Sequence, residues 1–214
     1  MRERRLPVFG VLAAGTAVVL AYVTALPVGA STTVATSHQC TASALGQTQT
    51  ATQNDDVVVT APTSTAAGST FQVVLAPQPQ TVPSQSGNFT VKSIKNLTLK
   101  VTFANATISG TPTLSGGSSN LGTTGVSVSG NQIVTSASGP IPGGASFTLD
   151  TLTVNFVAGT AGSAATTSLV GTSSASTTDL HFTTVVQAGP FTVNADTSCV
   201  PNPNPTGLSS TSST

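Results

Sequence analysis

The chain has 214 residues and a formal net charge of zero, and only 6% of its residues are charged, against about a quarter in an average soluble protein. From Ser31 onward it holds three lysines, five aspartates and no arginine, which leaves a formal charge of −2. Nucleic-acid phosphates are bound by clusters of Lys and Arg, so we expect no nucleic-acid partner. The low charge comes with substantial hydrophobicity, which is not the composition of a disordered chain.

Residues 1–30 have the three parts of a signal peptide. A basic start precedes an apolar run over residues 6–26, and small residues then lead up to Ser31, as a signal peptidase requires. We predict cleavage between Ala30 and Ser31, with Ala35 as a second candidate. Because the apolar run approaches the ~20 residues that span a bilayer, the alternative is an uncleaved membrane anchor. Both interpretations place the rest of the chain outside the cytoplasm, secreted or in the cell envelope.

The region from Cys40 to Cys199 alternates between short runs rich in Val, Thr and Ser and turns rich in Gly, Pro and Asn. Val and Thr favour strands, and helix-period patterns are missing. The clearest strand is Leu97–Phe103, in which apolar and polar residues alternate strictly. About eight to ten such strands predict an all-β fold. We expect an antiparallel two-sheet sandwich of the immunoglobulin-like type, with a jelly roll as the alternative.

Two local patterns add detail to this prediction. Val126–Val128 and Ile133–Val134 flank a Ser-Gly-Asn-Gln turn and predict a hairpin. The apolar alternation changes phase near Asp150, which predicts a bulge or a bend. Seven phenylalanines follow the leader, all in predicted strands or at their edges, and this distribution predicts a role in the core. They are Phe71, Phe89, Phe103, Phe147, Phe156, Phe182 and Phe191.

The two cysteines, Cys40 and Cys199, bound the predicted domain. We expect a polar lead-in over residues 31–39, a single β-sandwich over 40–199, and a disordered tail over 200–214, where alternating proline gives way to Ser and Thr. An exported protein meets an oxidising compartment, so we predict a disulfide between the two cysteines. A reactive or metal-binding thiol is the alternative, but no CxxC motif or His/Cys cluster supports it.

Asp179 and His181 are weak candidates for chemistry. In a strand, residues two apart project from the same face, which here is opposite to Leu180 and Phe182, so we expect an exposed pair. An Asp–His pair can orient an imidazole for base catalysis or contribute to a metal site. A polar pair on the surface is the simpler interpretation. The other histidine, His38, precedes the predicted domain.

No other motif predicts a catalytic or cofactor site. Asn54–Asp56 offers oxygen atoms to Ca²⁺ but lacks the spaced acidic pattern of a dedicated loop, so we interpret it as the turn before a strand. A G-x-S-x-G motif is absent from the sequence. We expect no cofactor and no bound metal. The leading hypothesis is a non-catalytic, secreted or envelope-associated protein with a structural or binding role toward an unknown envelope protein or polymer. The alternative is an envelope-acting hydrolase or lyase that uses Asp179 and His181.

Three stretches carry a resemblance to a known group of proteins: Ser37–Cys40, Thr60–Phe71 and Thr192–Cys199. In these stretches, and in its layout over residues 38–200, the chain resembles exported actinobacterial proteins of unassigned function with an immunoglobulin-like β-sandwich. The resemblance implies export, a β-sandwich, and an early and a late cysteine. Some of these relatives carry enzyme labels such as dehydratase, cyclase or xylosidase. The resemblance transfers no site residues, because this sequence shows none that would carry such reactions.

Overall fold

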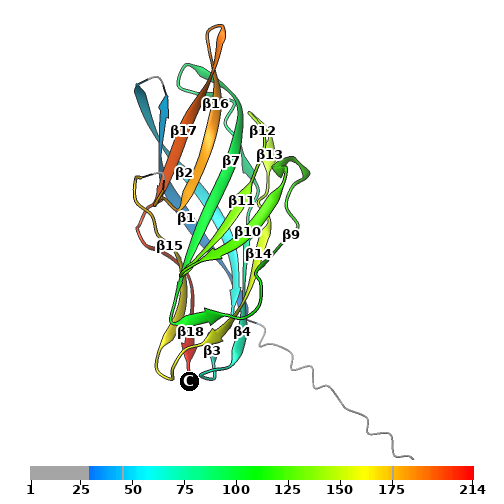
Figure 1. The fold of residues 1–214 in the computed structure, drawn as a ribbon, viewed down its shortest axis with the longest axis vertical. Coiled ribbons are helices and arrows are strands. Elements are labelled where there is room, and N and C mark those ends of the chain that lie inside the picture. The colour runs from blue at the N-terminus through cyan, green and yellow to red at the C-terminus, as the bar shows by residue number, and fades with distance from the viewer. Residues whose placement is uncertain (1–28, 45, 175) are drawn as a thin grey trace, which may run out of the picture.

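The structure is a computed structural model that describes residues 29–44, 46–174 and 176–214. These residues form strands almost throughout, with one short 3-10 helix, η1 (Ser119–Leu121) (Figure 1). The predicted all-β class is confirmed. Within the described part of the chain, no helix is long and apolar enough to cross a membrane.

The strands fall into two length classes. The longer strands are β1 (Ala30–Ala44), β2 (Gln47–Ala61), β4 (Thr70–Pro77), β7 (Phe89–Ala104), β10 (Thr124–Ser129), β11 (Gln132–Ala137), β14 (Thr151–Ala158), β15 (Ala164–Leu169), β16 (Leu180–Ala188), β17 (Phe191–Pro201) and β18 (Thr206–Ser213). The strands of two or three residues are β3 (Ser64–Thr65), β5 (Gln80–Thr81), β6 (Gln85–Ser86), β8 (Ala106–Ile108), β9 (Thr113–Ser115), β12 (Ile141–Pro142) and β13 (Ser146–Phe147).

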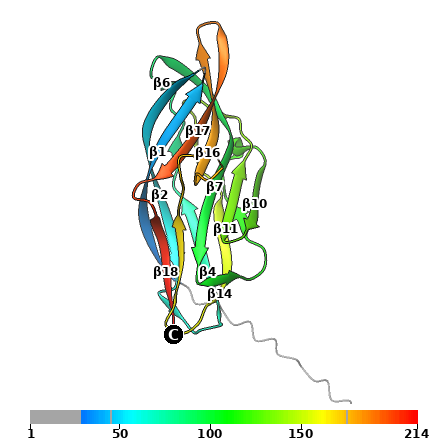
Figure 2. The same ribbon diagram turned by 60° about the vertical axis from the view of Figure 1, so that its left-hand side comes forward.

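Most strands belong to one 16-stranded sheet with the central order β3-β18-β15-β7-β16-β17-β1-β2-β4-β14-β8, while β13 and β5 form a separate pair. The large sheet folds over on itself, so that β2, β4 and β14 face β7, β11, β15 and β18 across buried apolar side chains (Figure 1, Figure 2). The result is the expected sandwich-like arrangement. Its two layers are joined by hydrogen bonds through β17 and β1 instead of forming two separate sheets.

Three phenylalanine rings in contact mark the closely packed end of the sandwich. The ring centroid of Phe156 lies 5.7 Å from that of Phe71 and 5.4 Å from that of Phe103. Offset or tilted rings at such separations add to the stabilisation from burial alone. We call the buried cluster around these rings, which includes Val73 and Val154, the phenylalanine core.

The local sequence patterns are confirmed where they can be compared with the structure. The alternating stretch Leu97–Phe103 lies in β7, and its apolar residues face the interior. β10 and β11 form the predicted hairpin, which turns at Gly130 with φ 58°. The change of phase near Asp150 falls between β13, which pairs with β5, and β14, which pairs with β4.

Both predicted flanks of the domain are wrong, because the residues on each side of the cysteines belong to the sheet. Residues 31–39 lie in β1, which pairs with β2 along its whole length from Ala30↔Ala61 to Ala44↔Gln47. Residues 206–213 form β18, which pairs with β15. Pairing of this kind uses backbone groups, so a Ser/Thr-rich segment can join a sheet with little apolar content. Leu208 and Thr211 are both buried in β18.

The predicted core role holds for most of the phenylalanines but not for all. Phe191 is 71% exposed, because it begins β17 at the tip of the β16–β17 hairpin, and the prediction for this residue is wrong. Phe89, the first residue of β7, is half-buried. A position at the end of a strand has no facing layer above it, so the pattern of alternation does not guarantee burial there.

The predicted signal peptide lies outside the described residues, except for Gly29 and Ala30. Cleavage between Ala30 and Ser31 stays a prediction, and it would leave β1 intact from its second residue onward. Cleavage after Ala35 would instead remove the stretch of β1 that pairs with residues 56–61 of β2. The first site is therefore the one that the folded domain favours.

Candidate functional site

The disulfide joins the two strands at which the layers of the sandwich meet. Cys40 of β1 and Cys199 of β17 are direct partners in the antiparallel pair, and their Cα atoms lie 3.9 Å apart. The predicted disulfide is confirmed. Among the described residues there is no free cysteine. The alternative, a reactive or metal-binding thiol, is therefore wrong for both cysteines.

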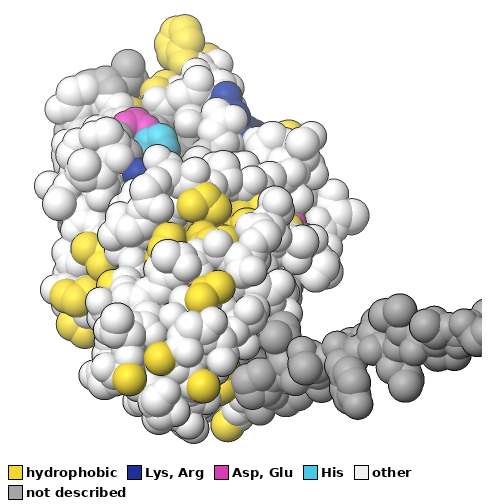
Figure 3. Space-filling model, turned by 60° about the horizontal axis from the view of Figure 1, so that its bottom comes forward, with side chains coloured by type: hydrophobic (Ala, Val, Ile, Leu, Met, Phe, Trp, Pro, Cys, Tyr) yellow, Lys and Arg dark blue, Asp and Glu magenta, His cyan; other side chains and the backbone are white. Residues whose placement is uncertain are grey.

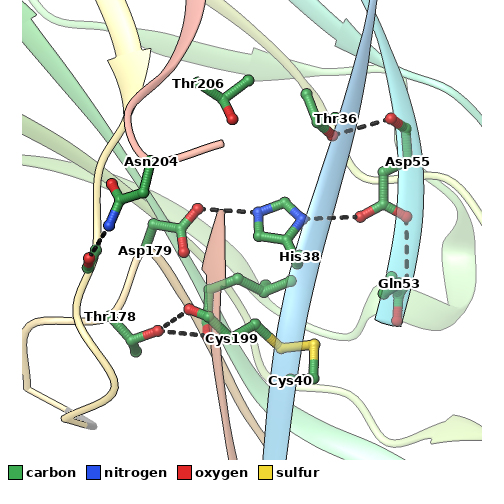
Figure 4. Close-up of polar contacts among 12 residues, drawn as sticks. Thr36, His38, Cys40, Gln53, Asp55, Thr178, Asp179, Cys199, Asn204 and Thr206 are labelled. Atoms are coloured by element: carbon green, nitrogen blue, oxygen red, sulfur yellow. Dashed lines mark hydrogen bonds and ion pairs between the residues drawn. A yellow bond between two sulfur atoms is a disulfide. The ribbon is translucent and has the colours of Figure 1, made fainter. Parts of the chain in front are cut away.

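Two residues before Cys40, on the same face of β1, lies a histidine that sequence reasoning placed outside the domain. His38 is only 2% exposed. Its Nε2 lies 2.9 Å from Oδ2 of Asp179, and its Nδ1 lies 3.6 Å from Oδ2 of Asp55 (Figure 4). We call Asp55, His38 and Asp179 the histidine cluster. It links β2, β1 and the segment that leads into β16.

The histidine cluster holds a positive charge in a buried place. Burial lowers the pKa of His38, but the hydrogen bond to Asp179, the contact with Asp55 and the charges of both carboxylates together outweigh it and raise the pKa to about 9. A buried charge is tolerated only when it is paired in this way. At neutral pH His38 is therefore an imidazolium between two carboxylates, and it is not available as a general base.

A chain of polar contacts leads from the histidine cluster to the edge of the sheet. Gln53 donates from Nε2 to Oδ1 of Asp55 at 3.2 Å and to Oε1 of Gln80, on β5, at 3.0 Å. Thr36 donates to the backbone oxygen of Asp55 at 2.9 Å. These contacts hold the Asp55 carboxylate in position and tie it to the segment that carries β5 and β6.

The predicted pairing of Asp179 with His181 on one exposed face is wrong. Asp179 is completely buried and bonds His38, whereas His181 Nε2 lies 2.6 Å from Oδ1 of Asp196 on the neighbouring strand β17. The difference arises because Asp179 precedes β16, which begins at Leu180, so the alternation of a strand does not extend to it. The hydrolase or lyase hypothesis required Asp179 and His181 to act together, and the two side chains have different partners.

The acidic stretch Asn54–Asp56 is not a turn, because β2 runs through it without interruption. Asp55 points inward to His38, while Asn54 and Asp56 are exposed. In the described ranges no group of three or more His, Cys, Asp or Glu has the arrangement of a metal site. The sequence did contain a signal for the histidine cluster: His38 and Cys40 are two residues apart, and a cysteine that bridges to the last strands must face inward.

A large cavity lies next to the histidine cluster, between the two layers. Its volume is about 580 Å³. Much of its wall is a second set of buried apolar residues, from β7, β16 and the segments between β4 and β14. Representative wall residues are Val82, Val91, Leu97, Leu121, Phe147 and Phe182. From β1 and β2 the wall receives smaller side chains, among them Cys40, Ala42 and Ala51.

The lining of the cavity reaches exposed side chains at an edge of β2 that has no backbone partner. β2 pairs with β4 only over Val57–Thr60, and in the described structure its earlier half faces β5 and β6 through side chains alone. Ser86 donates to Oε1 of Gln49 at 3.3 Å, and Gln53 bonds Gln80 as described above. We call this edge of the cavity the glutamine mouth. It is lined by Gln47, Gln49, Gln53, Gln80, Gln85 and Ser86.

The outer surface carries few charges on the face that Figure 3 shows. In Figure 3, hydrophobic side chains appear at scattered points and in one hollow of the face in view, and charged side chains form only small groups. The described residues that line the cavity include no Lys or Arg, and their only titratable side chains are those of His38, Asp55 and Asp150. This arrangement can hold an apolar molecule, and it offers an anion no Lys or Arg side chain, while the His38 imidazolium is already paired with two carboxylates.

Comparisons with known proteins give one fold relationship. No protein-family model and no curated protein matches the chain. A solved structure, that of a putative membrane anchored protein from the actinobacterium Corynebacterium diphtheriae, is similar with a TM-score of 0.53 and 19% sequence identity. The match covers 86% of this chain and 38% of that chain. At this level of identity the two proteins share a fold, a β-sandwich found in an actinobacterial protein described as membrane anchored.

Proposed function

We propose that this protein is an exported, non-catalytic binding protein of the cell envelope that holds an apolar ligand inside its β-sandwich. The observation that carries the proposal is the cavity of about 580 Å³ with its largely apolar wall. Sites for small molecules commonly have volumes of about 300–1,000 Å³ and are lined mainly by apolar side chains. Closely packed interiors, by contrast, hold few voids larger than a water molecule.

Energetics support a ligand in this cavity. Apolar surface in contact with water is unfavourable by roughly 25 cal/mol per Å², and the wall of this cavity is largely apolar. An apolar occupant restores the missing van der Waals contacts and removes its own surface from water. The cavity is therefore more readily understood as a binding site than as a packing fault.

Three observations support a location in the cell envelope. The leader has the pattern of a signal peptide, with an uncleaved anchor as its alternative. The disulfide Cys40–Cys199 fits an oxidising compartment. The structural neighbour from Corynebacterium diphtheriae is described as membrane anchored. These points agree with the resemblance to exported actinobacterial β-sandwich proteins.

The absence of catalysis is supported by the state of His38. Both ring nitrogens face carboxylates, and the raised pKa keeps the ring protonated at neutral pH. General base catalysis needs a group that can accept a proton near the working pH. The histidine cluster thus braces β1 against β2 and the entry to β16, and it forms part of the cavity wall.

The proposal is tested with the uncharged fluorophore N-phenyl-1-naphthylamine, which brightens in apolar sites. We expect a saturable increase in its fluorescence with the mature protein. Ala51 is the direct strand partner of Cys40 and lines the cavity near its mouth, so Ala51→Trp should abolish the increase. Asn54→Trp places the same ring on β2 at an exposed position outside the cavity wall and should leave binding unchanged. Fluorescence that does not saturate, or that is equal in both variants, would contradict the proposal.

A further inference from the structure

We propose that the ligand is a single-chain amphiphile with an uncharged, hydrogen-bonding head group, whose chain lies in the cavity and whose head lies at the glutamine mouth. This inference rests on the proposed function and names the class of ligand. It is drawn from three features of the cavity: its length, the amides around its mouth and the signs of its charges.

The shape of the cavity fits one aliphatic chain. Its lining residues on β2 run from Gln47 to Val57, a distance of about 33 Å at the rise of an extended strand. A cavity of about 580 Å³ that extends this far along one strand is elongated. An elongated cavity of this kind admits an extended polymethylene chain along its axis.

The mouth fits an uncharged head group. Glutamine amides offer both donors and acceptors, and the hydroxyls of Ser and Thr do the same. Gln47, Gln49 and Gln85 are exposed at the rim, while Gln53 and Gln80 close its inner side. A hydroxyl- or amide-bearing head can therefore exchange hydrogen bonds with the rim without losing those that it makes to water.

The charges near the mouth disfavour an anionic head. One imidazolium stands between the two carboxylates of the histidine cluster, which leaves a formal charge of −1. Asp150, farther along the wall, adds a second carboxylate, and its Oδ2 is buried without a hydrogen-bond partner among the described residues. The three lysines lie outside the lining of the cavity. A carboxylate or phosphate would meet like charge, and the one cation in the wall, His38, is already paired with two carboxylates.

For a cationic head, the carboxylate beside Gln53 is already engaged, and Asp150 is not among the residues of the glutamine mouth. Asp55 already faces the His38 imidazolium at 3.6 Å and accepts a hydrogen bond from Gln53 at 3.2 Å. Bringing an ammonium to this place would remove it from water, which is costly for a charged group unless a partner compensates. The observations therefore favour a hydroxyl or an amide over an ammonium.

The first test compares three probes that share a twelve-carbon chain: monolauroylglycerol, dodecanoate and dodecylammonium. Each is titrated at neutral pH, below its micelle concentration, against the mature protein loaded with the naphthylamine fluorophore. We expect monolauroylglycerol to displace the fluorophore with an affinity at least roughly tenfold higher than either charged probe. Equal or tighter displacement by dodecanoate or by dodecylammonium would overturn the inference.

The second test reverses the charge preference. Gln49→Lys places an ammonium at the mouth and should raise the affinity for dodecanoate roughly tenfold. Thr48→Lys adds the same charge one residue away, on the face of β2 outside the cavity wall, and should change that affinity by less than about twofold. An equal effect of both substitutions would show that the head group does not lie at Gln49.

The two tests separate the failure of this inference from the failure of the proposed function. If the fluorophore binds and Ala51→Trp blocks it, but dodecanoate displaces it as well as monolauroylglycerol does, the cavity is a binding site and the head group is misassigned. If neither the fluorophore nor any amphiphile binds in a saturable way, the proposed function itself fails, and the inference fails with it.

Discussion

The phenylalanine core and the cavity are built by the same folded sheet, yet one is closed and the other is open. Around Phe71 and Phe156 the packing leaves no space for a water molecule, whereas the neighbouring cavity measures about 580 Å³. The difference follows from side-chain size. Where β4 and β14 supply phenylalanines to the core, β1 and β2 supply Ala42 and Ala51 to the cavity wall. Small side chains at these positions leave room between the layers.

The comparison also separates two ways of holding the layers together. The phenylalanine core relies on close packing of rings and branched aliphatic side chains. Beside the cavity, the disulfide Cys40–Cys199 and the histidine cluster connect β1 to β17, β2 and the start of β16. Covalent and ionic links thus connect the strands of the sandwich beside the cavity.

The largest expected difference comes from removing one ring from each region. Phe156→Ala should lower the free energy of unfolding by about 4 kcal/mol, because the ring is enclosed by Phe71 and Phe103. Phe182→Ala should cost only about 2 kcal/mol, because its ring borders the cavity and has fewer neighbours to lose. Urea unfolding of the ligand-free variants measures both values. Equal losses would mean that the cavity wall is packed as tightly as the core.

The next expected effect concerns the histidine cluster and is read from pH. Because the pKa of His38 is raised from 6.5 to about 9 in the folded protein, its contribution is fully present below pH 6.5 and is lost as the pH rises through 9. The total loss is on the order of 3 kcal/mol. Unfolding free energies between pH 6 and pH 10 should show this decline.

A matched pair of variants assigns that decline to the buried histidine. His38→Gln should flatten the pH dependence between pH 6.5 and 9, and it should also lower the stability at pH 6, because two carboxylates then lose their charge partner. His181→Gln, on the exposed pair with Asp196, serves as the control and should keep the decline. A decline that survives in His38→Gln would show that another group causes it.

The sequence predicts the core better than the cavity, and the reason is physical. In Leu97–Phe103 and in the Val126–Val134 hairpin, the alternation of apolar and polar residues indicates which side chains face inward. The strand and the hairpin therefore appear in the structure as predicted. β18 has one large apolar residue, Leu208, and enters the sheet mainly through its backbone, which leaves almost no trace in the side-chain pattern. The volume of the cavity depends on how far apart the layers stand, and no local pattern encodes that distance.

The candidate site, too, could be predicted from the sequence only in part. The bridge between Cys40 and Cys199 follows from cysteine count and compartment. The partners of His38 come from β2 and from the residue before β16, and only the register of β1 with its neighbours brings them together. The alternation that pairs Asp179 with His181 applies only inside a strand, and Asp179 lies one residue outside β16.

A smaller effect is expected from adding atoms instead of removing them. Ala165→Leu inserts three carbons into the phenylalanine core and should cost about 1–3 kcal/mol, because the surrounding side chains have no room to move. Ala137→Leu adds the same atoms at the cavity wall, where they can enter open space, and should be neutral or stabilising by up to about 1 kcal/mol. Thermal unfolding of the two variants gives the comparison directly. A large loss in Ala137→Leu would mean that the wall cannot accept added volume.

The smallest effect is expected at a phenylalanine that belongs to neither region. Phe191 is 71% exposed at the tip of the β16–β17 hairpin, so Phe191→Ser should change the free energy of unfolding by no more than about 0.5 kcal/mol. The same substitution at Phe147, which is 4% exposed in the cavity wall, is the internal comparison and should cost several times more. Because both residues are phenylalanines in predicted strands, the contrast tests whether facing layers, and not strand pattern, decide what a ring contributes. A loss at Phe191 as large as that at Phe147 would place the hairpin tip inside the packed part of the protein.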